Sequence, residues 1–221
     1  FHEWSPDMAY VLGFLFADGS VNKKLTGVTI YLSTKDISIL KFIRRSIFGK
    51  QHLYRFIGSD ARTGKAIDQT SLHLYSTIMI GKLLELGLKP RKTYNDDPFP
   101  NVPDDMMPHF VRGYLDGDGS TSISSGDVCS VSFVGSPAFI TGFRDSLMQL
   151  ADMKCKPIKL THGKTADWAS VCWSGVIDIR KFREFTYPSG FSFCLKRKKA
   201  NLDKWLSKPR QSFTSVPWSE E

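Results

Sequence analysis

The sequence contains two short segments of the same pattern 100 positions apart, Gly13–Ser20 and Gly113–Ser120. In each copy a glycine, an aromatic residue and a leucine precede a small residue and then aspartate-glycine-serine. An isolated Asp-Gly pair indicates only a turn. A repeated pair, each at the end of an apolar helix, predicts two similar halves. Each half would contribute one carboxylate, Asp18 or Asp118, to a shared site.

Small residues recur four positions apart in each copy, Gly13 with Ala17 and Gly113 with Gly117, and therefore share one face of a helix. Two such helices can approach closely and bring the aspartates at their ends together. Paired carboxylates repel each other, and helix C-termini disfavour negative charge. Mg²⁺, which binds carboxylate and phosphate oxygens together, would compensate. This chemistry is metal-assisted phosphodiester hydrolysis. The alternative is that both aspartates only cap helices or turn the chain.

The composition favours an anionic partner. Thirty lysines and arginines against 22 aspartates and glutamates give a net charge of +8 and a pI near 9.3. Nucleic acid is the usual partner of such a protein, the alternative being a basic protein without one. No apolar run is long enough to span a membrane. The four cysteines form no Cys-x-x-Cys pair and are expected to be buried, reduced thiols of an intracellular protein. They are Cys129, Cys155, Cys172 and Cys194.

The order of elements is helix, two strands, helix, two strands, helix, and it occurs twice. We therefore expect an α+β fold of two αββαββα halves related by a pseudo-twofold axis, each an antiparallel sheet with helices on one face. The predicted halves are 1–93 and 104–206, the latter with a basic tail helix at 197–206. A linker rich in proline and aspartate, 94–103, separates them, and 207–221 form the end of the chain.

The predicted strands have one apolar and one polar face. Val28, Ile30 and Leu32 alternate with polar or small residues, which indicates a sheet covered on one side only. The uncovered faces would suit a surface that reads a DNA groove, although they could also simply face solvent. The candidate DNA-binding residues are Thr29, Tyr31, Arg55, Ser71, His73, Ser130, Ser132, Lys159 and Thr161.

The two segments Val11–Gly19 and Val111–Gly119 resemble the motif of the LAGLIDADG homing endonucleases. The resemblance covers nearly the whole chain, as a single-chain member with two repeats. It implies that the motif helices form the interface of the halves and that saddle-like sheets straddle double-stranded DNA. It also implies a monomer.

The resemblance further implies a sequence-specific enzyme with a long, asymmetric DNA site, which leaves staggered ends with short 3′ overhangs. Asp18 and Asp118 would bind the catalytic metal, assisted by the backbone carbonyls of Ala17 and Gly117. Mg²⁺ is the expected cofactor. Mn²⁺ would substitute for it, and Ca²⁺ would support binding without efficient cleavage. Such a protein acts inside a cell, in an organelle or in a bacterial or archaeal cytoplasm.

Two departures from the motif concern its aspartate and its lysine. Phe16 replaces an aspartate that the second copy keeps as Asp116, a position that the resemblance marks as structural. The catalytic lysine of the family maps to Lys196, whereas Pro90 takes its place in the first half. Lys92 and Lys35 are then the candidates to assist there, and the two active sites are expected to be unequal.

Other functions remain open from the sequence. An intron RNA maturase and a catalytically silent DNA-binding protein use the same scaffold. A bilobal aspartic protease also pairs aspartates from two halves. Its signature, however, is Asp-Thr/Ser-Gly on strand loops, whereas this chain has Asp-Gly-Ser after helices.

Overall fold

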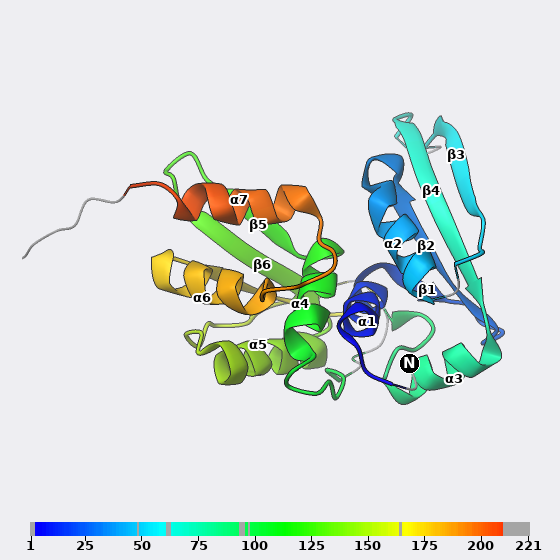
Figure 1. Ribbon diagram of the computed structural model, residues 1–221, viewed down its shortest axis with the longest axis horizontal. Helices are drawn as coiled ribbons and strands as arrows, with labels where there is room; N and C mark the ends of the chain where they lie inside the picture. The colour runs from blue at the N-terminus through cyan, green and yellow to red at the C-terminus, as the bar shows by residue number, and fades with distance from the viewer. Residues whose placement is uncertain are drawn as a thin grey trace, which may run out of the picture.

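The computed structural model confirms two halves with the same order of elements (Figure 1). It describes residues 3–47, 49–60, 63–92, 96, 98–163 and 165–209. Of the predicted linker, residues 94, 95 and 97 lie outside the described residues, as does the predicted end of the chain from residue 210 onward.

Each half is an αββαββα unit, and the second adds a tail helix, as predicted. The first half consists of α1 (Pro6–Asp18), β1 (Gly19–Val21), β2 (Gly27–Ser33), the short 3-10 helix η1 (Thr34–Asp36), α2 (Ile37–Ile47), β3 (Leu53–Ser59), β4 (Ala66–Tyr75) and α3 (Thr77–Glu85). The second consists of α4 (Met107–Asp116), β5 (Ser120–Ile123), β6 (Cys129–Gly135), α5 (Pro137–Ala151), β7 (Lys159–Thr161), β8 (Trp168–Ser174), α6 (Val176–Thr186) and α7 (Lys196–Leu206). The antiparallel sheets have the equivalent strand orders β1-β2-β4-β3 and β5-β6-β8-β7.

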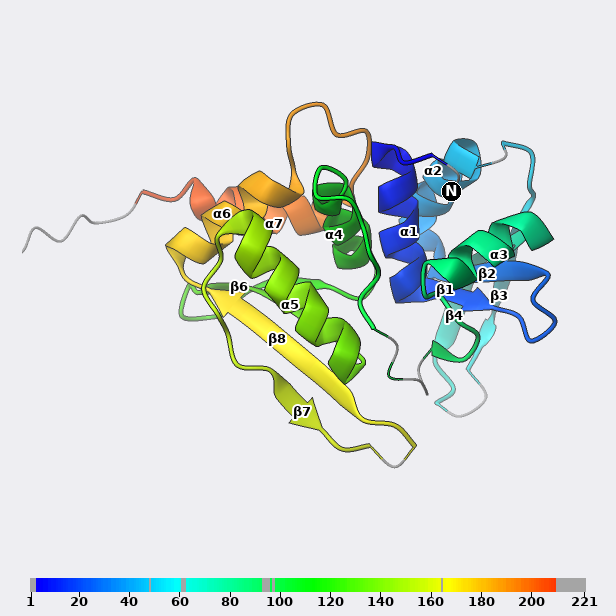
Figure 2. The ribbon, with the colours of Figure 1, turned by 90° about the horizontal axis from the view of Figure 1, so that it is seen from below.

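Helix α1 begins at a proline and is capped by Ser5, whose hydroxyl accepts a hydrogen bond from the Met8 amide at 3.2 Å. Every residue from Ala9 to Ala17 is buried, as a helix without a polar face requires. Helix α4 lies beside α1 at the centre of the molecule in both ribbon views (Figures 1 and 2). The two motif helices therefore form the interface between the halves.

Two glycines allow the backbones of α1 and α4 to touch. A β-carbon at Gly13 would lie 2.0 Å from the Phe110 carbonyl oxygen, and one at Gly113 would lie 2.0 Å from the Tyr10 carbonyl oxygen. Both distances are far shorter than any real carbon–oxygen contact, so no larger residue fits at either position without moving a helix. The contact is reciprocal, as the pseudo-twofold repeat predicts.

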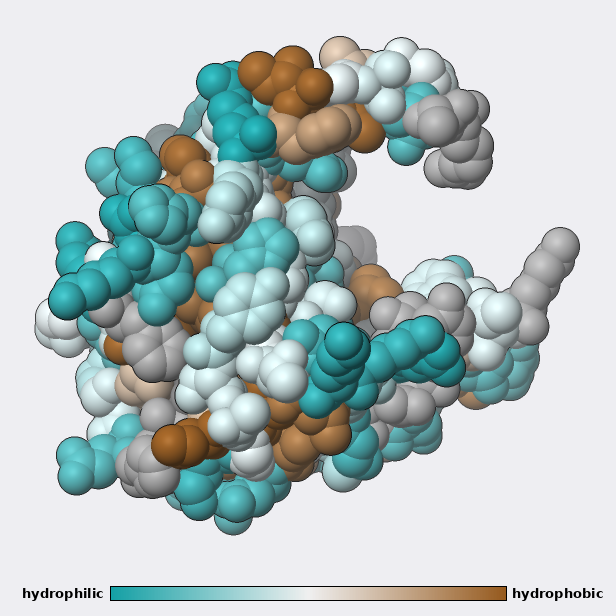
Figure 3. Space-filling model, turned by 90° about the vertical axis from the view of Figure 1, so that its right-hand side faces the viewer, coloured by the Kyte–Doolittle hydropathy of each residue, from teal (hydrophilic) through white to brown (hydrophobic). Residues whose placement is uncertain are grey.

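The sheets are covered on one side only. In the first sheet, Ile30 of β2 and Leu72 of β4 are buried beneath Leu40 and Ile43 of α2. In the second sheet, α5 and α6 lie along one side of β6 and β8 (Figure 2). Seen end-on, the molecule is C-shaped, with a hollow open on one side (Figure 3). This shape agrees with the saddle expected from the sequence.

The four cysteines are unpaired, but only Cys129 is buried. The predicted burial is wrong for Cys155 and Cys172, which are exposed. Cys172 alternates in β8 with the buried Val171 and Trp173, so its side chain faces the open side of the sheet. Within the described ranges, no helix has both the length and the apolar character needed to cross a bilayer.

The replacement Gly13→Ala should lower the free energy of unfolding by about 1–3 kcal/mol or more, because its β-carbon would collide with a backbone oxygen of α4. The matched control is Gly81→Ala in α3, where a β-carbon would meet nothing within 4 Å. That replacement should raise the free energy of unfolding by up to about 1 kcal/mol, since alanine favours helix over glycine. Urea denaturation measures both. Equal effects at the two positions would contradict the close approach of the helices.

Candidate active site

Asp18 and Asp118 meet where the motif helices end. Asp18 is the last residue of α1, and Asp118 follows the end of α4 by two residues. A β-carbon at Gly117 would lie 3.1 Å from Asp18 Oδ2 and 2.3 Å from the Ala17 β-carbon, so the helix ends are in contact as well. Asp18 is half-buried, and Asp118 keeps part of its surface exposed while it lines the wall of a cavity. The prediction that the repeat brings the two aspartates together is confirmed.

Both carboxylates are less acidic than free aspartate. Partial burial and the neighbouring Asp118 carboxylate raise the pKa of Asp18 to about 6. Loss of water contact also raises the pKa of Asp118, and Lys92 and Lys198 act against this shift. A pair of carboxylates that resists ionisation in this way gains stability from a cation placed between them.

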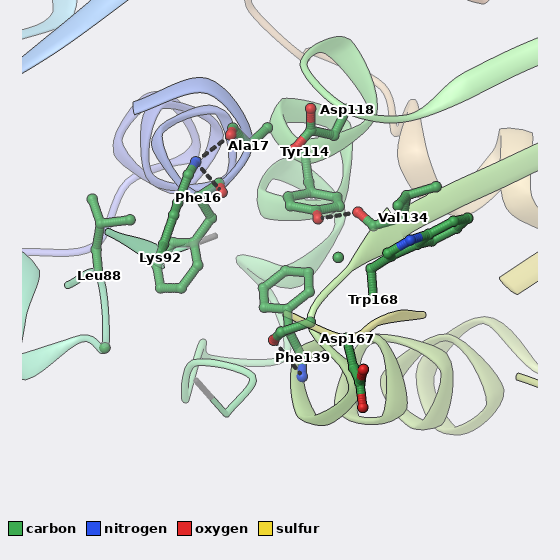
Figure 4. A pocket seen from close by; sticks show the side chains of 13 residues that line it. Phe16, Ala17, Leu88, Lys92, Tyr114, Asp118, Val134, Phe139, Asp167 and Trp168 are labelled. Atoms are coloured by element: carbon green, nitrogen blue, oxygen red, sulfur yellow. Dashed lines mark hydrogen bonds between the residues drawn. The ribbon is translucent and has the colours of Figure 1, made fainter. Parts of the chain in front are cut away.

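A lysine closes the end of each motif helix. Lys92 Nζ donates hydrogen bonds to the carbonyl oxygens of Leu15 at 3.2 Å, of Phe16 at 2.6 Å and of Ala17 (Figure 4). Ammonium groups stabilise helix C-termini because the last carbonyls there are free to accept hydrogen bonds and carry partial negative charge.

Lys198 does the same for α4. Its Nζ donates to the carbonyl oxygens of Leu115 at 2.6 Å, Asp116 at 2.9 Å and Gly117 at 3.0 Å. A fourth hydrogen bond, of 2.7 Å, goes to Gly119. Burial lowers the pKa of Lys92 and of Lys198 to about 8. The two lysines are therefore equivalent in position, partners and acidity.

The lysine at the end of α4 is not the one that the sequence reasoning selected. Lys196, predicted as the catalytic residue, is the exposed first residue of α7, and Lys198 lies against the helix end instead. Lys35 is exposed in η1. Pro90 does not deprive the first half of a lysine, because Lys92 occupies the position equivalent to Lys198. The predicted inequality of the two sites thus loses its basis in a missing lysine.

The difference between Phe16 and Asp116 has a structural explanation. Asp116 is buried, and its Oδ2 accepts hydrogen bonds from the Tyr10 hydroxyl at 2.8 Å and from the Leu195 amide at 2.7 Å. The second contact ties α4 to the residue that precedes α7, which carries Lys198. Phe16 instead stacks on Phe139, with ring centroids 5.7 Å apart.

Arg112, which the sequence reasoning missed, also holds the segment that precedes α7. It is fully buried, and its guanidinium donates to the carbonyl oxygens of Phe193 at 2.9 Å and Thr186 at 3.0 Å. The group also lies over the rings of Tyr10 and Phe191. An arginine in the buried middle of the motif helix was the available signal for this role.

A cavity of about 370 Å³ between the two halves adjoins Asp118 (Figure 4). Asp118 and Lys92 lie on its wall with the apolar side chains of Phe16, Tyr114 and Phe139. Within the described part of the chain, no group of three or more histidine, cysteine, aspartate or glutamate side chains is gathered as a metal site.

The two aspartates nevertheless fit Mg²⁺, which proteins usually bind through one or two carboxylates together with phosphate oxygens of the substrate. The Ala17 and Gly117 carbonyls, predicted as further ligands, already accept hydrogen bonds from the lysines.

Most of the predicted DNA-binding residues share the open faces of the sheets. Strand pairing places Thr29 opposite His73 and Tyr31 opposite Ser71, on the side away from α2. In the second sheet the open-face residues from the predicted set are Ser130, Ser132, Lys159 and Thr161.

Arg55 was placed on the wrong face. It lies opposite Thr70 on the other side of the sheet and forms an ion pair with Asp68 at 2.8 Å. The open-face residues of β3 are its neighbours Tyr54 and Phe56, which the sequence reasoning did not select.

Known proteins resemble the chain in structure and not in sequence. No protein-family model and no curated protein matches it. The structure of the homing endonuclease I-WcaI bound to its DNA recognition sequence is similar with a TM-score of 0.60 and 9% identity, over 90% of this chain and 88% of that one. Mesophilic variants of the homing endonuclease I-DmoI give a TM-score of 0.56 and 13% identity, over 90% and 97% of the two chains.

Full-length DUF199/WhiA from Thermatoga maritima has the same degree of similarity, with a TM-score of 0.56 and 14% identity. The alignment covers 97% of this chain and 64% of that one. A separate structure of the WhiA N-terminal domain is described as a LAGLIDADG domain. The chain therefore has the LAGLIDADG fold that the repeated motif predicts.

The replacement Asp116→Ala should lower the free energy of unfolding by roughly 1–3 kcal/mol for each of the two buried donors that lose their acceptor. Asp116→Asn keeps one acceptor oxygen and should be much less destabilising. Its effect should also depend on pH. Because burial raises the pKa of Asp116 to about 6, the folded protein holds this proton more tightly than the unfolded chain, so the carboxylate lowers stability as pH rises.

The stability of Asp116→Asn relative to the parent protein should therefore increase between about pH 4 and pH 6. Chemical denaturation at several pH values measures this difference. If the asparagine and alanine variants were equally destabilised at every pH, the hydrogen bonds would not be the function of Asp116.

Proposed function

We propose that this chain is a sequence-specific endonuclease that hydrolyses phosphodiester bonds of double-stranded DNA with Mg²⁺. The observation that carries the proposal is the meeting of Asp18 and Asp118 at the ends of two touching helices, with one lysine beneath each end. A solely structural pair of helix ends would have no need of two carboxylates that raise each other's electrostatic cost.

Different residues would bind the metal and accept the proton. Asp18 and Asp118 would hold the metal, with the Ala17 and Gly117 carbonyls as further candidates. When bound, Mg²⁺ supplies positive charge for the phosphate oxygens and for the leaving oxygen. Lys92 and Lys198 position the helix ends, and with a pKa of about 8 each Nζ is partly neutral near physiological pH. A neutral Nζ can accept the proton of the attacking water.

The shape and charge of the chain support a DNA substrate. The hollow in Figure 3 and the net charge of +8 suit a polyanion. Both halves of the site come from one chain, so a monomer suffices to place an aspartate and a lysine against each DNA strand. Short 3′ overhangs, a long asymmetric target and a role in intron or intein homing belong to the same proposal, as does Mn²⁺ as a substitute for Mg²⁺.

A second candidate is a DNA-binding protein without cleavage. It is favoured by one observation, that the ammonium groups of Lys92 and Lys198 already occupy the Ala17 and Gly117 carbonyls and supply positive charge at the site. Such a protein would bind DNA equally well with and without Mg²⁺. An RNA maturase on this scaffold would also lack a requirement for the two carboxylates.

The replacements Asp18→Asn and Asp118→Asn should each abolish cleavage and leave DNA binding within a fewfold of the parent protein. Asparagine keeps the shape of the side chain but loses the charge that holds the metal, whereas DNA binding depends mainly on phosphate and groove contacts. Cleavage of a selected target and gel-shift affinity measure the two effects. EDTA should also stop cleavage and be reversed by Mg²⁺.

Two outcomes would contradict this assignment. Cleavage by Asp118→Asn at the rate of the parent protein would remove Asp118 from the site. Specific binding without cleavage by the parent protein, in Mg²⁺ and in Mn²⁺, would favour the silent DNA-binding protein.

The replacements Lys92→Met and Lys198→Met should each slow cleavage of one strand about 10²- to 10⁴-fold, the usual loss when a group that transfers a proton is removed. If each lysine serves one strand, nicked DNA should accumulate on a supercoiled target. Lys196→Met, in the same turn of α7 but exposed, is the matched control and should cleave normally.

The pH profile provides a second measurement for these variants. Because burial lowers the pKa of both lysines to about 8, the neutral form increases with pH, and the cleavage rate of the parent protein should rise up to about pH 8. A rise that persists unchanged in the double methionine variant would contradict the role of the lysines.

A further inference from the structure

The open faces of the two sheets carry different side chains, although the sheets have the same topology. The face of the first sheet, called here the aromatic face, consists of Tyr31, Tyr54, Phe56, His73 and Tyr75. The face of the second sheet, called here the serine face, carries Ser120, Ser122, Ser130, Ser132, Ser170, Cys172 and Ser174, with Val134, Lys159, Thr161 and Trp168 toward one end. Rings thus cover most of the first open face. Hydroxyl groups predominate on the second, where Trp168 is the one aromatic ring among the strand residues.

His73 is the centre of the aromatic face. The ring of Tyr54 lies edge-on to it, with centroids 5.4 Å apart, and that of Tyr31 also lies edge-on, at 6.1 Å. Tyr75 stacks on it at 6.3 Å. Contacts of this kind hold aromatic rings in defined orientations. The four rings therefore form one ordered surface.

Hydrogen bonds fix the orientation of His73. Its Nδ1 lies 3.2 Å from the Thr29 hydroxyl and its Nε2 lies 3.1 Å from the Ser71 hydroxyl. Both ring nitrogens are thereby engaged within the sheet, and what His73 offers to a partner is its ring carbons. Phe56 is held in another way. A β-carbon at Gly58 would lie 2.7 Å from its ring, so this glycine leaves the space into which the ring extends.

The aromatic face is exposed. Tyr31, Tyr54 and Phe56 expose 57%, 58% and 59% of their surface, and Tyr75 exposes 68%. Contiguous exposed rings of this size mark a binding surface more often than a solvated one. Because they line the same side of the sheet as the predicted DNA-binding residues Thr29 and Ser71, the partner expected here is the partner of the hollow.

Basic side chains are absent from the aromatic face. Strands β1 to β4, all within the described ranges, contain one arginine and no lysine, and the arginine, Arg55, faces the other side. Arginine and lysine are the usual readers of guanine in the major groove. Apolar side chains instead contact the methyl group of thymine, which projects into that groove.

We propose that the first half recognises its half of the DNA site through thymine methyl groups, which pack on the aromatic face in the major groove. The serine face recognises the other half mainly through hydroxyl hydrogen bonds and the Lys159 ammonium group, so binding there depends less on those methyl groups. The inference rests on the proposed function, since it requires that the chain bind DNA in the hollow. It also favours DNA over RNA, because RNA carries uracil, which lacks the methyl group, and its major groove is too narrow for side chains.

The test starts from a DNA target selected by binding from a randomised library. The thymines of one half-site at a time are then replaced by deoxyuridine, which removes only the methyl group. Affinity measured by gel shift should fall roughly fourfold for each methyl group that the aromatic face buries. The same replacement in the other half-site should cause a smaller total loss of affinity.

Two adjacent residues of β3 provide matched variants. Phe56 is on the aromatic face, and Ile57 is on the opposite face of the same strand, with similar exposures of 59% and 68%. Phe56→Ala should reduce affinity for the thymine target and reduce the difference between thymine and deoxyuridine. It also identifies the half-site that the first half contacts. Ile57→Ala should change neither. Thermal denaturation verifies that both variants fold.

The outcomes separate this inference from the proposed function. If the chain binds its target but tolerates deoxyuridine equally in both half-sites, or if Phe56→Ala acts like Ile57→Ala, methyl recognition is overturned and the endonuclease proposal stands. If the chain binds no DNA, both are overturned.

Discussion

The backbone contact between α1 and α4 determines where everything else lies. At Gly13 and Gly113 each helix touches a carbonyl oxygen of the other, so no side chain separates the two backbones there. The contact sets the distance between the helix ends and hence between Asp18 and Asp118. It also sets the angle at which the two sheets diverge and the hollow between them. A side chain at either glycine would change the site and the hollow together.

The same contact brings negative charges close together, and two lysines of the site partly compensate them. Two helix C-termini and two partly desolvated carboxylates concentrate negative charge in a small region. Lys92 and Lys198 compensate this charge from different parts of the chain. Lys92 lies in the segment after α3, and Lys198 lies in the first turn of α7. Each lysine donates its hydrogen bonds to backbone carbonyls, so the two carboxylates stay available for the proposed metal ion. The raised pKa of Asp18 shows that the lysines do not compensate fully.

Much of this could be predicted from the sequence, because the repeat and the apolar periodicity are local signals. They predicted the αββαββα halves, the touching helices and the paired aspartates. Details that depend on the side of a helix or strand on which a residue lies were missed. Lys196 and Lys198 are two positions apart, about 200° around a helix, so an offset of two residues selects the exposed side of α7 instead of the side that faces α4. Arg55 failed for the same reason in a strand, where a shift of one residue exchanges the faces.

Because both halves belong to one chain, they can have the same lysine and aspartate at the helix ends and different side chains on the open faces of the sheets. Each lysine must close its own helix, and each aspartate must face the other, so both copies obey the same constraint. The open faces obey no such constraint, because each would contact a different stretch of the proposed DNA target. A homodimer would repeat one face and require a palindromic partner. With rings predominant on one face and hydroxyl groups on the other, this chain presents two unlike surfaces around one symmetric centre, as the proposed asymmetric DNA site would require.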